Sequence, residues 1–322
     1  MARQRGLISA SQAASLLADD EIRALLGSGT WCRVRRGVYA EGGALPTDRF
    51  GRQLRHDDAF LVSSGTTHPR SHISAAVALG LEVLLPAEPV AHLTADRPTR
   101  WRSQHGVVLH VARYQPTELA QGAGVACLGA GRTALDLARS CPVREGVVAC
   151  DSALRHGTSP AELAAALERM AGWPGVRRAR RALDLADAGS ESVGESLARL
   201  LVLELGVGKP ETQFGLCDGH RRAYADLRVG RHLIEFDGKV KYTGAYGDGV
   251  DVLWEEKQRQ DFLLGCGLGM SRLVWSDLFS GRGQALARLE REYRATCQRF
   301  GTSIADLEAF RAPPRFASGT AA

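Results

Sequence analysis

The chain has 322 residues, of which 44% are hydrophobic and 24% are charged, enough to build two or three domains with apolar cores. It has no apolar run of about 18 residues and begins with a polar, arginine-containing segment, which predicts a cytoplasmic protein without a membrane span. The seven cysteines form no Cys-x-x-Cys pair, a pattern typical of reduced thiols and not of a disulfide framework or a zinc site. The net charge of +5 permits contact with nucleic acid without requiring it.

Residues 1–56 are predicted to form two short helices followed by a β-ribbon. Ser9 begins a Ser-x-x-Gln capping box, which indicates the start of the first helix. Asp19 or Asp20 would cap the second helix, and the alternating pattern of residues 31–39 predicts the ribbon. This order of helix, turn, helix and wing is that of a winged helix-turn-helix, whose second helix enters the DNA major groove.

Charge in this segment favours DNA as a partner. Residues 1–56 contain nine arginines and five acidic residues. Arg33, Arg35 and Arg36 lie on the predicted wing, where they are candidates for DNA binding through phosphate contacts. A solvated wing edge or a protein-binding surface is the alternative, because acidic residues at the start of the second helix suit the helix dipole but not phosphates.

The same segment resembles the N-terminal domain of AbiEi-type antitoxins from abortive-infection toxin–antitoxin systems. The matching stretches are Gly6-Leu7-Ile8-Ser9, Gln12-Ala13 and Gly29-Thr30-Trp31-Cys32-Arg33-Val34-Arg35-Arg36-Gly37-Val38-Tyr39. The resemblance implies a DNA-binding head that represses its own operon and, as a further partner, a cognate toxin.

Residues 57–187 are predicted to form a mixed α/β scaffold, and they also resemble the middle portion of AbiEi-type antitoxins. Strands are expected over residues 90–94 and 107–111, and an apolar helix over residues 73–79. The resemblance implies no catalytic role for this region.

Four histidines of the scaffold leave two interpretations open. They could form a metal or catalytic cluster, or they could cap helices and lie partly buried. The second interpretation is favoured because no spacing typical of metal ligands recurs. The four residues are His68, His72, His92 and His110.

From residue 188 onward the pattern predicts a helix, three strands, a second helix, a fourth strand and a final helix. Ser192 and Glu195 form a capping box that starts the first helix. The later elements are expected over residues 211–217, 223–229, 232–239, 254–264, 270–275 and 277–300.

Acidic residues and a lysine gather on the second and third of these strands. Glu235, Asp237 and Lys239 alternate and would share one strand face, and the tight connection at Gly230 would fold Asp226 back beside them. Such a face suits a core poorly but suits Mg²⁺ and a phosphodiester well. The chain has only four lysines and three of them lie in or near this motif, which favours a chemical role for lysine here.

This pattern resembles the PD-(D/E)XK nuclease superfamily, and in particular its very-short-patch-repair-like (Vsr-like) branch. The separated matches run in order from Ser190 to Leu278: Glu191 to Ser196, Pro210-Glu211-Thr212-Gln213, Ala225-Asp226, Glu235-Phe236-Asp237-Gly238, Trp254 to Arg259, and Arg272 to Leu278. The resemblance implies a restriction-endonuclease-like α/β core that hydrolyses DNA phosphodiester bonds with Mg²⁺ or Mn²⁺. The metal ligands it implies are Asp226, Glu235, Asp237 and Glu195.

Several roles in this site remain open. In the register of Glu235, the position of the superfamily lysine is occupied by Asp237. The lysine would then be Lys239, or Lys257 from the following helix, or the site would be a degenerate DNA-binding relic. Glu195 could cap its helix, ligate the metal, or do both. Gln213 is a further candidate, either contacting the phosphate or a ligand, or forming a cross-strand hydrogen bond.

Together these patterns predict a mixed α/β protein with four parts: a winged-helix head (1–56), a scaffold (57–187), an endonuclease-like domain (188–300) and a partly disordered tail (301–322). The leading expectation is a cytoplasmic DNA-binding protein with a Mg²⁺-dependent DNA nuclease domain that serves defence or repair. The alternative is a non-catalytic AbiEi-like antitoxin or transcriptional repressor with a degenerate nuclease fold.

Overall fold

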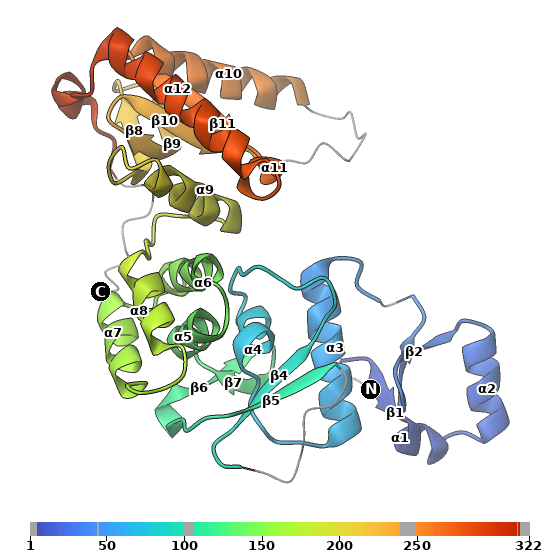
Figure 1. Cartoon of the computed structure of the whole chain (residues 1–322). Coiled ribbons are helices and arrows are strands. Elements are labelled where there is room, and N and C mark those ends of the chain that lie inside the picture. Colours follow the sequence, from blue (N-terminus) through green and yellow to red (C-terminus); the bar gives the residue numbers. More distant parts are fainter. Residues whose placement is uncertain (1–4, 44, 99–105, 239–248, 314, 316–322) are drawn as a thin grey trace. The chain divides into compact units, whose positions relative to one another are not determined.

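The computed structural model describes residues 5–43, 45–98, 106–238, 249–313 and 315, with the helix alone for 249–253 and 255. It divides the chain into two compact units, residues 1–186 and 187–322 (Figure 1). Both units combine helices with small sheets, so the predicted mixed α/β class is confirmed. Within the described ranges, no helix is both long and apolar enough to cross a membrane.

A three-stranded sheet with two helices opens unit 1. Its elements are β1 (Leu7–Ser9), α1 (Ala10–Ala14), α2 (Asp19–Gly27), β2 (Trp31–Arg35) and β3 (Val38–Glu41). The strand order is β1-β3-β2, with antiparallel pairs. The capping box at Ser9 is confirmed, because Ser9 Oγ accepts from the Gln12 N–H at 3.2 Å and Gln12 Oε1 accepts from the Ser9 N–H at 3.0 Å.

Two local predictions for this part are wrong. The N-cap of α2 is Ala18, not Asp19 or Asp20, and Glu21 accepts a hydrogen bond from the Ala18 N–H at 2.7 Å. The short strand β1 was not expected, because three residues are too few to give a periodic pattern.

The middle of unit 1 is built from two helices and two β-ribbons. Its elements are α3 (Arg49–Ser64), α4 (His72–Ala78), β4 (Ala91–Ala95), β5 (Val107–Val111), η2 (Pro116–Glu118), β6 (Leu119–Gly122) and β7 (Val125–Leu128). The β4–β5 ribbon is parallel and the β6–β7 ribbon is antiparallel. Arg70 joins them by pairing with Leu93 and Cys127. Its fully buried guanidinium forms an ion pair with Asp58 of α3, and α3 itself runs across the boundary predicted at residue 56.

Four helices complete unit 1: α5 (Ala130–Ser140), α6 (Val143–Arg155), α7 (Pro160–Arg169) and α8 (Val176–Asp184). Buried aliphatic side chains such as Leu135, Val147 and Leu163 lie between them. Gly146 allows α5 and α6 to approach closely, since a Cβ there would lie 2.8 Å from the backbone of Ala138.

Unit 2 is one four-stranded sheet with helices packed against it. Its elements are α9 (Val193–Glu204), β8 (Glu211–Cys217), β9 (Arg222–Val229), β10 (His232–Phe236), α10 (Gly249–Gly265), β11 (Gly269–Leu273), α11 (Trp275–Leu278), α12 (Arg282–Phe300) and η3 (Ala305–Phe310). The strand order is β11-β10-β9-β8, with an antiparallel meander from β8 to β10 and a parallel β11 that follows α10. Gly194 brings α9 against the sheet, because a Cβ there would overlap the Phe236 ring.

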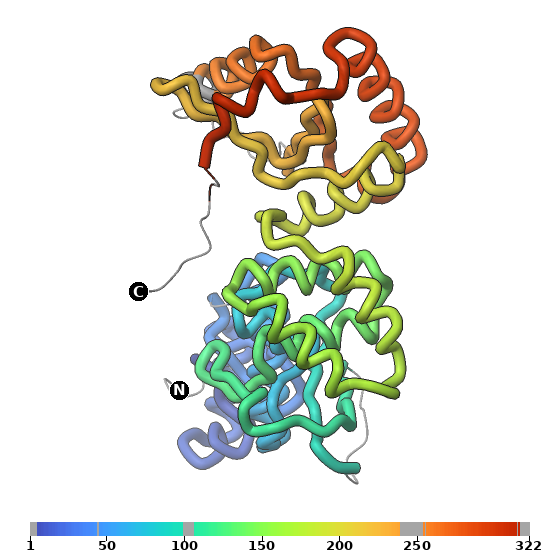
Figure 2. The backbone as a smooth tube through the Cα atoms, turned by 90° about the vertical axis from the view of Figure 1, so that its left-hand side faces the viewer, coloured from blue at the N-terminus to red at the C-terminus, as the bar shows by residue number. Residues whose placement is uncertain are grey.

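The segment after α12 is part of this fold, at least as far as Arg311, which corrects the prediction of a tail from residue 301. Leu307 is buried in the core of the sheet beside Phe214 and Leu216. Leu216 also forms a β-bridge with Arg311. Figure 2 shows this last described stretch (red) returning beside the yellow strands of unit 2.

Candidate active site

Polar residues form a row across the four strands of unit 2. The register pairs Thr212 with Leu227 and Phe214 with Ala225, which sets Gln213 opposite Asp226. It also pairs Ile234 with Leu227, so the next residues along, Glu235 and Asp226, are neighbours. On the other side, Glu235 pairs with Arg272 of β11. Directly opposite residues have neighbouring side chains, so the sheet brings one amide, two carboxylates and one guanidinium side by side.

Gln213 holds a left-handed backbone conformation in the middle of β8. Its φ is +51°, a region that costs a non-glycine residue on the order of 1–3 kcal/mol. Its side-chain Nε2 donates to Glu195 Oε2 at 3.3 Å. Its Oε1 is buried and has no hydrogen-bond partner in the described part of the chain. A strained residue with an unpaired buried oxygen is a candidate site residue and not merely a cross-strand link.

Glu195, in the first turn of α9, lies beside Gln213 at one end of this row. Its carboxylate caps the helix: Oε2 accepts from the Glu191 N–H at 2.8 Å, and Oε1 accepts from Ser192 Oγ at 3.0 Å. Burial, with the nearby charge of Asp226, raises the pKa of Glu195 to about 7. Glu195 is therefore a helix cap and a member of the acidic cluster at once.

Asp226 and Glu235 complete the cluster. Asp226 Oδ2 accepts a hydrogen bond from the Phe236 N–H at 2.8 Å, which fixes the carboxylate against β10. Burial raises the pKa of Asp226 and of Glu235, and the charge of Asp226 adds to the rise at Glu235. Glu235 is only 7% exposed. Glu235 is buried, Glu195 and Asp226 are half-buried, and the charge of Asp226 repels both glutamates. Such a site favours either protons or a cation.

The cation that contacts Glu235 is an arginine of α10. Arg259 donates from Nη2 to Glu235 Oε1 at 2.7 Å and also pairs with Glu256 at 2.7 Å. Arg272 approaches Glu235 Oε2 at 3.7 Å and Glu256 at 3.2 Å. The charge and hydrogen bond of Arg259 lower the pKa of Glu235 against the effect of burial.

Two predicted site residues, Asp237 and Lys257, do not join this cluster in the described structure. Asp237 is exposed just beyond the end of β10, where its N–H donates to the Leu273 carbonyl at 2.8 Å. Lys257 is exposed on α10, two residues from Arg259, so it points to a different side of the helix. Lys239 lies outside the described residues. The predicted lysine of α10 is therefore replaced at Glu235 by Arg259.

The predicted DNA-binding arginines, two on β2 and Arg36 just after it, divide into two kinds. Arg33 and Arg36 are exposed, and Arg33 lies 6.0 Å from the centre of the Tyr39 ring. Arg35 lies 4.9 Å from the centre of the Phe60 ring, and burial lowers its pKa. Arg35 therefore serves packing between β2 and α3, and only the other two present a cationic edge.

Arg259 and Arg272 were not predicted as site residues. Both fall within the stretches quoted for the nuclease resemblance, Trp254 to Arg259 and Arg272 to Leu278. The available signal was the spacing of Glu256 and Arg259, three residues apart on a helix, which predicts an ion pair but not its position beside Glu235.

Comparison with known proteins leaves the family of this chain open. No family model matches the chain, and no curated protein matches it. Among solved structures, the chain is similar to the crystal structure of the RV2827C protein from Mycobacterium tuberculosis, at 17% identity and a TM-score of 0.39, over 60% of this chain and 74% of that one.

Proposed function

We propose that unit 2 is a Mg²⁺-dependent nuclease that hydrolyses phosphodiester bonds of DNA. The single observation that carries this proposal is the convergence of Glu195, Asp226 and Glu235 from α9, β9 and β10, three carboxylates whose pKa values are all raised by burial. The resemblance of residues 190–278 to PD-(D/E)XK nucleases supports it.

The residues present fit Mg²⁺. This ion prefers hard oxygen ligands, and the three acids supply them from three separate elements. A dication would relieve the repulsion that raises their pKa values. The unpaired buried Oε1 of Gln213 is a further oxygen of the right kind. When bound, Mg²⁺ would stabilise charge on the phosphate and lower the pKa of a coordinated water.

The other side chains have supporting roles in this proposal. Gln213 orients Glu195 through its Nε2, and the Phe236 N–H orients Asp226. Arg259 and Arg272 put positive charge beside Glu235, where they would attract the phosphate of the substrate.

Cleavage of supercoiled DNA in Mg²⁺ or Mn²⁺ tests the proposal. We expect the wild-type protein to nick the DNA, and we expect Asp226→Asn and Glu235→Gln to lower the rate by at least about 100-fold, a size typical of lost electrostatic stabilisation. Both changes keep the side-chain shape and remove the charge. Asp261→Asn is the matched control, since Asp261 is an exposed acid on α10, and it should cleave like the wild type.

A non-catalytic DNA-binding regulator, such as an AbiEi-like antitoxin, is the second candidate. Two observations favour it: the helix, helix, ribbon order of β1 to β3 with the exposed Arg33 and Arg36, and the guanidinium of Arg259 that already pairs with Glu235. The same DNA, used in a binding assay, separates the candidates. Binding by wild type, Asp226→Asn and Glu235→Gln alike, without cleavage by any of them, would reject the nuclease and support the regulator.

A further inference from the structure

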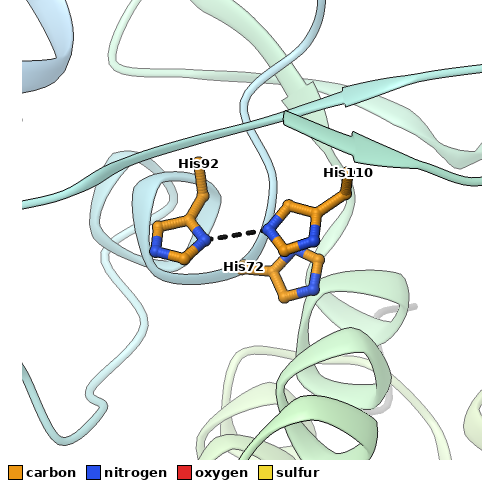
Figure 3. A group of neighbouring side chains, drawn as sticks. All are labelled: His72, His92 and His110. Carbon is orange, nitrogen blue, oxygen red and sulfur yellow. Dashed lines mark hydrogen bonds between the residues drawn. The ribbon is translucent and has the colours of Figure 1, made fainter. Parts of the chain in front are cut away.

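Three histidines of unit 1 meet from three different elements. His72 is the first residue of α4, His92 lies on β4 and His110 lies on β5. Each ring offers a nitrogen atom, and these nitrogens all lie within 4.8 Å of one another. Figure 3 shows the rings gathered beneath the β4–β5 ribbon. Among the residues that the structure describes, this is the one group of three or more His, Cys, Asp or Glu side chains that meets this distance.

The parallel ribbon explains why two of the rings converge. His92 pairs with Val108, and His110 pairs with Thr94. Because side chains alternate along a strand, residues two apart share a face, so both imidazoles project from the same face of the ribbon. The third ring belongs to His72. The preceding residue holds it beside β4, because the Ser71 N–H donates to the His92 carbonyl at 2.9 Å.

The spacing of the rings is close to that of a metal site. His92 Nδ1 and His110 Nε2 are 2.9 Å apart, and the His72 and His110 rings stack with centroids 3.6 Å apart. Nitrogens bound to a tetrahedral Zn²⁺ at about 2.0–2.1 Å lie about 3.3 Å from one another. Rotations of the side chains that unstack His72 from His110 and break the His92–His110 hydrogen bond would bring three nitrogens onto one ion.

The environment keeps the three imidazoles neutral. Burial lowers the pKa of His72, of His110 and, to about 4, of His92. Neutral imidazole is the form that donates a lone pair to a metal. His72 is almost fully buried, whereas His92 and His110 are half-buried, which leaves an approach for an ion.

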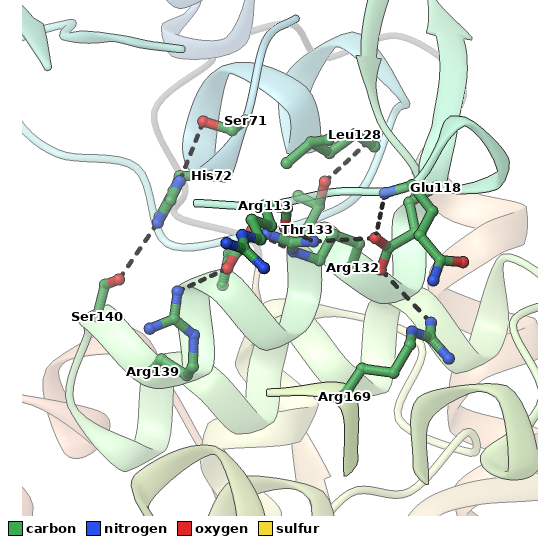
Figure 4. Close-up of polar contacts among 12 residues, drawn as sticks. Ser71, His72, Arg113, Glu118, Leu128, Arg132, Thr133, Arg139, Ser140 and Arg169 are labelled. Carbon is green, nitrogen blue, oxygen red and sulfur yellow. Dashed lines mark hydrogen bonds and ion pairs between the residues drawn. The ribbon is translucent and has the colours of Figure 1, made fainter. Parts of the chain in front are cut away.

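His72 is held in place by strain and by two hydroxyl groups. Its φ is +48°, which costs a non-glycine residue on the order of 1–3 kcal/mol. Its ring nitrogens lie 3.1 Å from Ser71 Oγ and 3.3 Å from Ser140 Oγ (Figure 4). A strained backbone that directs an imidazole into a cluster of imidazoles is typical of a functional site.

Nearby charges are paired within the same region. Arg132 donates to Glu118 at 3.1 Å (Figure 4). Arg132 and Arg139 each also donate to Asp136 at 2.8 Å. These carboxylates offset the repulsion that the two guanidinium groups would exert on a cation.

We propose that His72, His92 and His110 bind a divalent transition-metal ion, with Zn²⁺ the ion that three imidazole nitrogens and an open fourth position fit best. Imidazole ligands suit Zn²⁺, Cu²⁺ and Ni²⁺, whereas Mg²⁺ prefers oxygen. The site is thus distinct in chemistry from the carboxylates of unit 2, and it does not depend on the function proposed for them.

Titration of the metal-free, full-length protein with Co²⁺ tests the proposal. We expect one equivalent to give the visible absorption of tetrahedral Co²⁺ and to be displaced by Zn²⁺. Because the site contains no sulfur, the near-ultraviolet band of a thiolate–cobalt bond should be absent, which separates it from binding at the seven cysteines. His92→Gln and His110→Gln should each weaken binding by at least about 100-fold. His68→Gln, at a half-buried histidine outside the group, should bind like the wild type.

A second measurement on the wild-type protein keeps the test independent of variant folding. X-ray absorption at the zinc edge should show imidazole nitrogens and no sulfur in the first shell of the Zn²⁺-loaded protein. The proposal is overturned if the folded protein binds less than one equivalent of Co²⁺ or Zn²⁺, if sulfur ligands appear, or if His68→Gln loses binding as the other variants do.

Discussion

The acidic cluster of unit 2 and the histidine cluster of unit 1 respond to the same physical effect in opposite ways. Burial disfavours the charged form of any group. It raises the pKa of Glu195 to about 7 and lowers the pKa of His92 to about 4. The carboxylates therefore gain affinity for protons and cations, whereas the imidazoles lose their protons and present lone pairs. Burial, as the largest cause of the shift in both clusters, prepares two sites for two different kinds of ion.

The two clusters also differ in how far their ligand atoms are assembled. The histidine nitrogens lie within 4.8 Å of one another, and the carboxylates of unit 2 form no such group in the described part of the chain. Arg259 instead pairs with Glu235. A metal at the histidines needs side-chain rotations that replace the ring stack and the His92–His110 hydrogen bond. A metal at the carboxylates must draw them together and compete with a guanidinium.

Both the acidic cluster and the histidine cluster contain a residue with a strained backbone. Four non-glycine residues of the described ranges have positive φ: Arg5, His72, Ala123 and Gln213. Two of them, His72 and Gln213, belong to the two clusters. Strained residues persist where the surrounding structure over-determines them, and they concentrate at functional sites.

Replacing Arg259 tests the competition at Glu235 directly. In Arg259→Gln, Glu235 keeps its buried position, loses its 2.7 Å ion pair with Arg259 and keeps only the 3.7 Å contact with Arg272. Such a loss costs 3–5 kcal/mol when both partners are buried. Because the Arg259 side chain is 27% exposed, we expect a decrease of about 2 kcal/mol in the free energy of unfolding. Mg²⁺ should restore part of it, which thermal melts in EDTA and in Mg²⁺ would measure.

The control is Arg222→Gln, at an exposed arginine of β9, which should change the melting temperature little in either buffer. If Mg²⁺ stabilises Arg259→Gln no more than the wild type, the carboxylates do not hold the ion. The proposed Mg²⁺ site of unit 2 would then be rejected.

A second prediction concerns the buried acid Asp57, which is linked to His92 of the histidine cluster through Ser74. Ser74 Oγ donates to Asp57 Oδ1 at 2.9 Å and accepts from the His92 N–H at 2.8 Å. Burial raises the pKa of Asp57 from its ordinary value of 3.8 to about 7. The folded state therefore binds this proton more tightly, so the contribution of Asp57 to stability is full below pH 3.8 and is lost as the pH rises through about 7.

Asp57→Asn should remove this pH dependence. We expect the unfolding free energy of the wild type, relative to that of the variant, to fall by at most about 1.4 kcal/mol per pH unit over this range, as measured by urea unfolding at several pH values. Glu41→Gln, at an exposed acid of the same unit, should show no such trend. A constant difference between wild type and Asp57→Asn would contradict the raised pKa.

The sequence predicted best what depends on local pattern. The bounds of β8, the capping box at Ser9 and the N-cap at Ser192 agree with the structure, because these features depend on neighbouring residues. The box predicted at Ser192 forms only in half, since Glu195 accepts from the Glu191 N–H and not from the Ser192 N–H. The acidic residues of the motif were predicted as site residues, and the structure brings Glu195, Asp226 and Glu235 together with Gln213.

The contacts that depend on tertiary pairing could not be predicted in the same way. His72, His92 and His110 are 18 or more residues apart and match no ligand spacing, so their meeting depends on the parallel pairing of β4 with β5 and on the start of α4. Arg259 is one arginine among many, and only the path of α10 over β9 selects it.

The smallest expected effect separates strain from side-chain chemistry at Gln213. Gln213→Ala and Gln213→Gly both lose the hydrogen bond to Glu195, and only the glycine relieves the positive φ. We expect the glycine variant to be more stable than the alanine variant by about 1 kcal/mol, as measured by urea unfolding. At Arg222, an exposed strand position without positive φ, the order should be reversed. If the cleavage rate falls equally in both Gln213 variants, the amide side chain acts in the site. If the rate falls only in the glycine variant, the site depends on the strained backbone of Gln213, as we infer for the strained backbone of His72 in the histidine cluster.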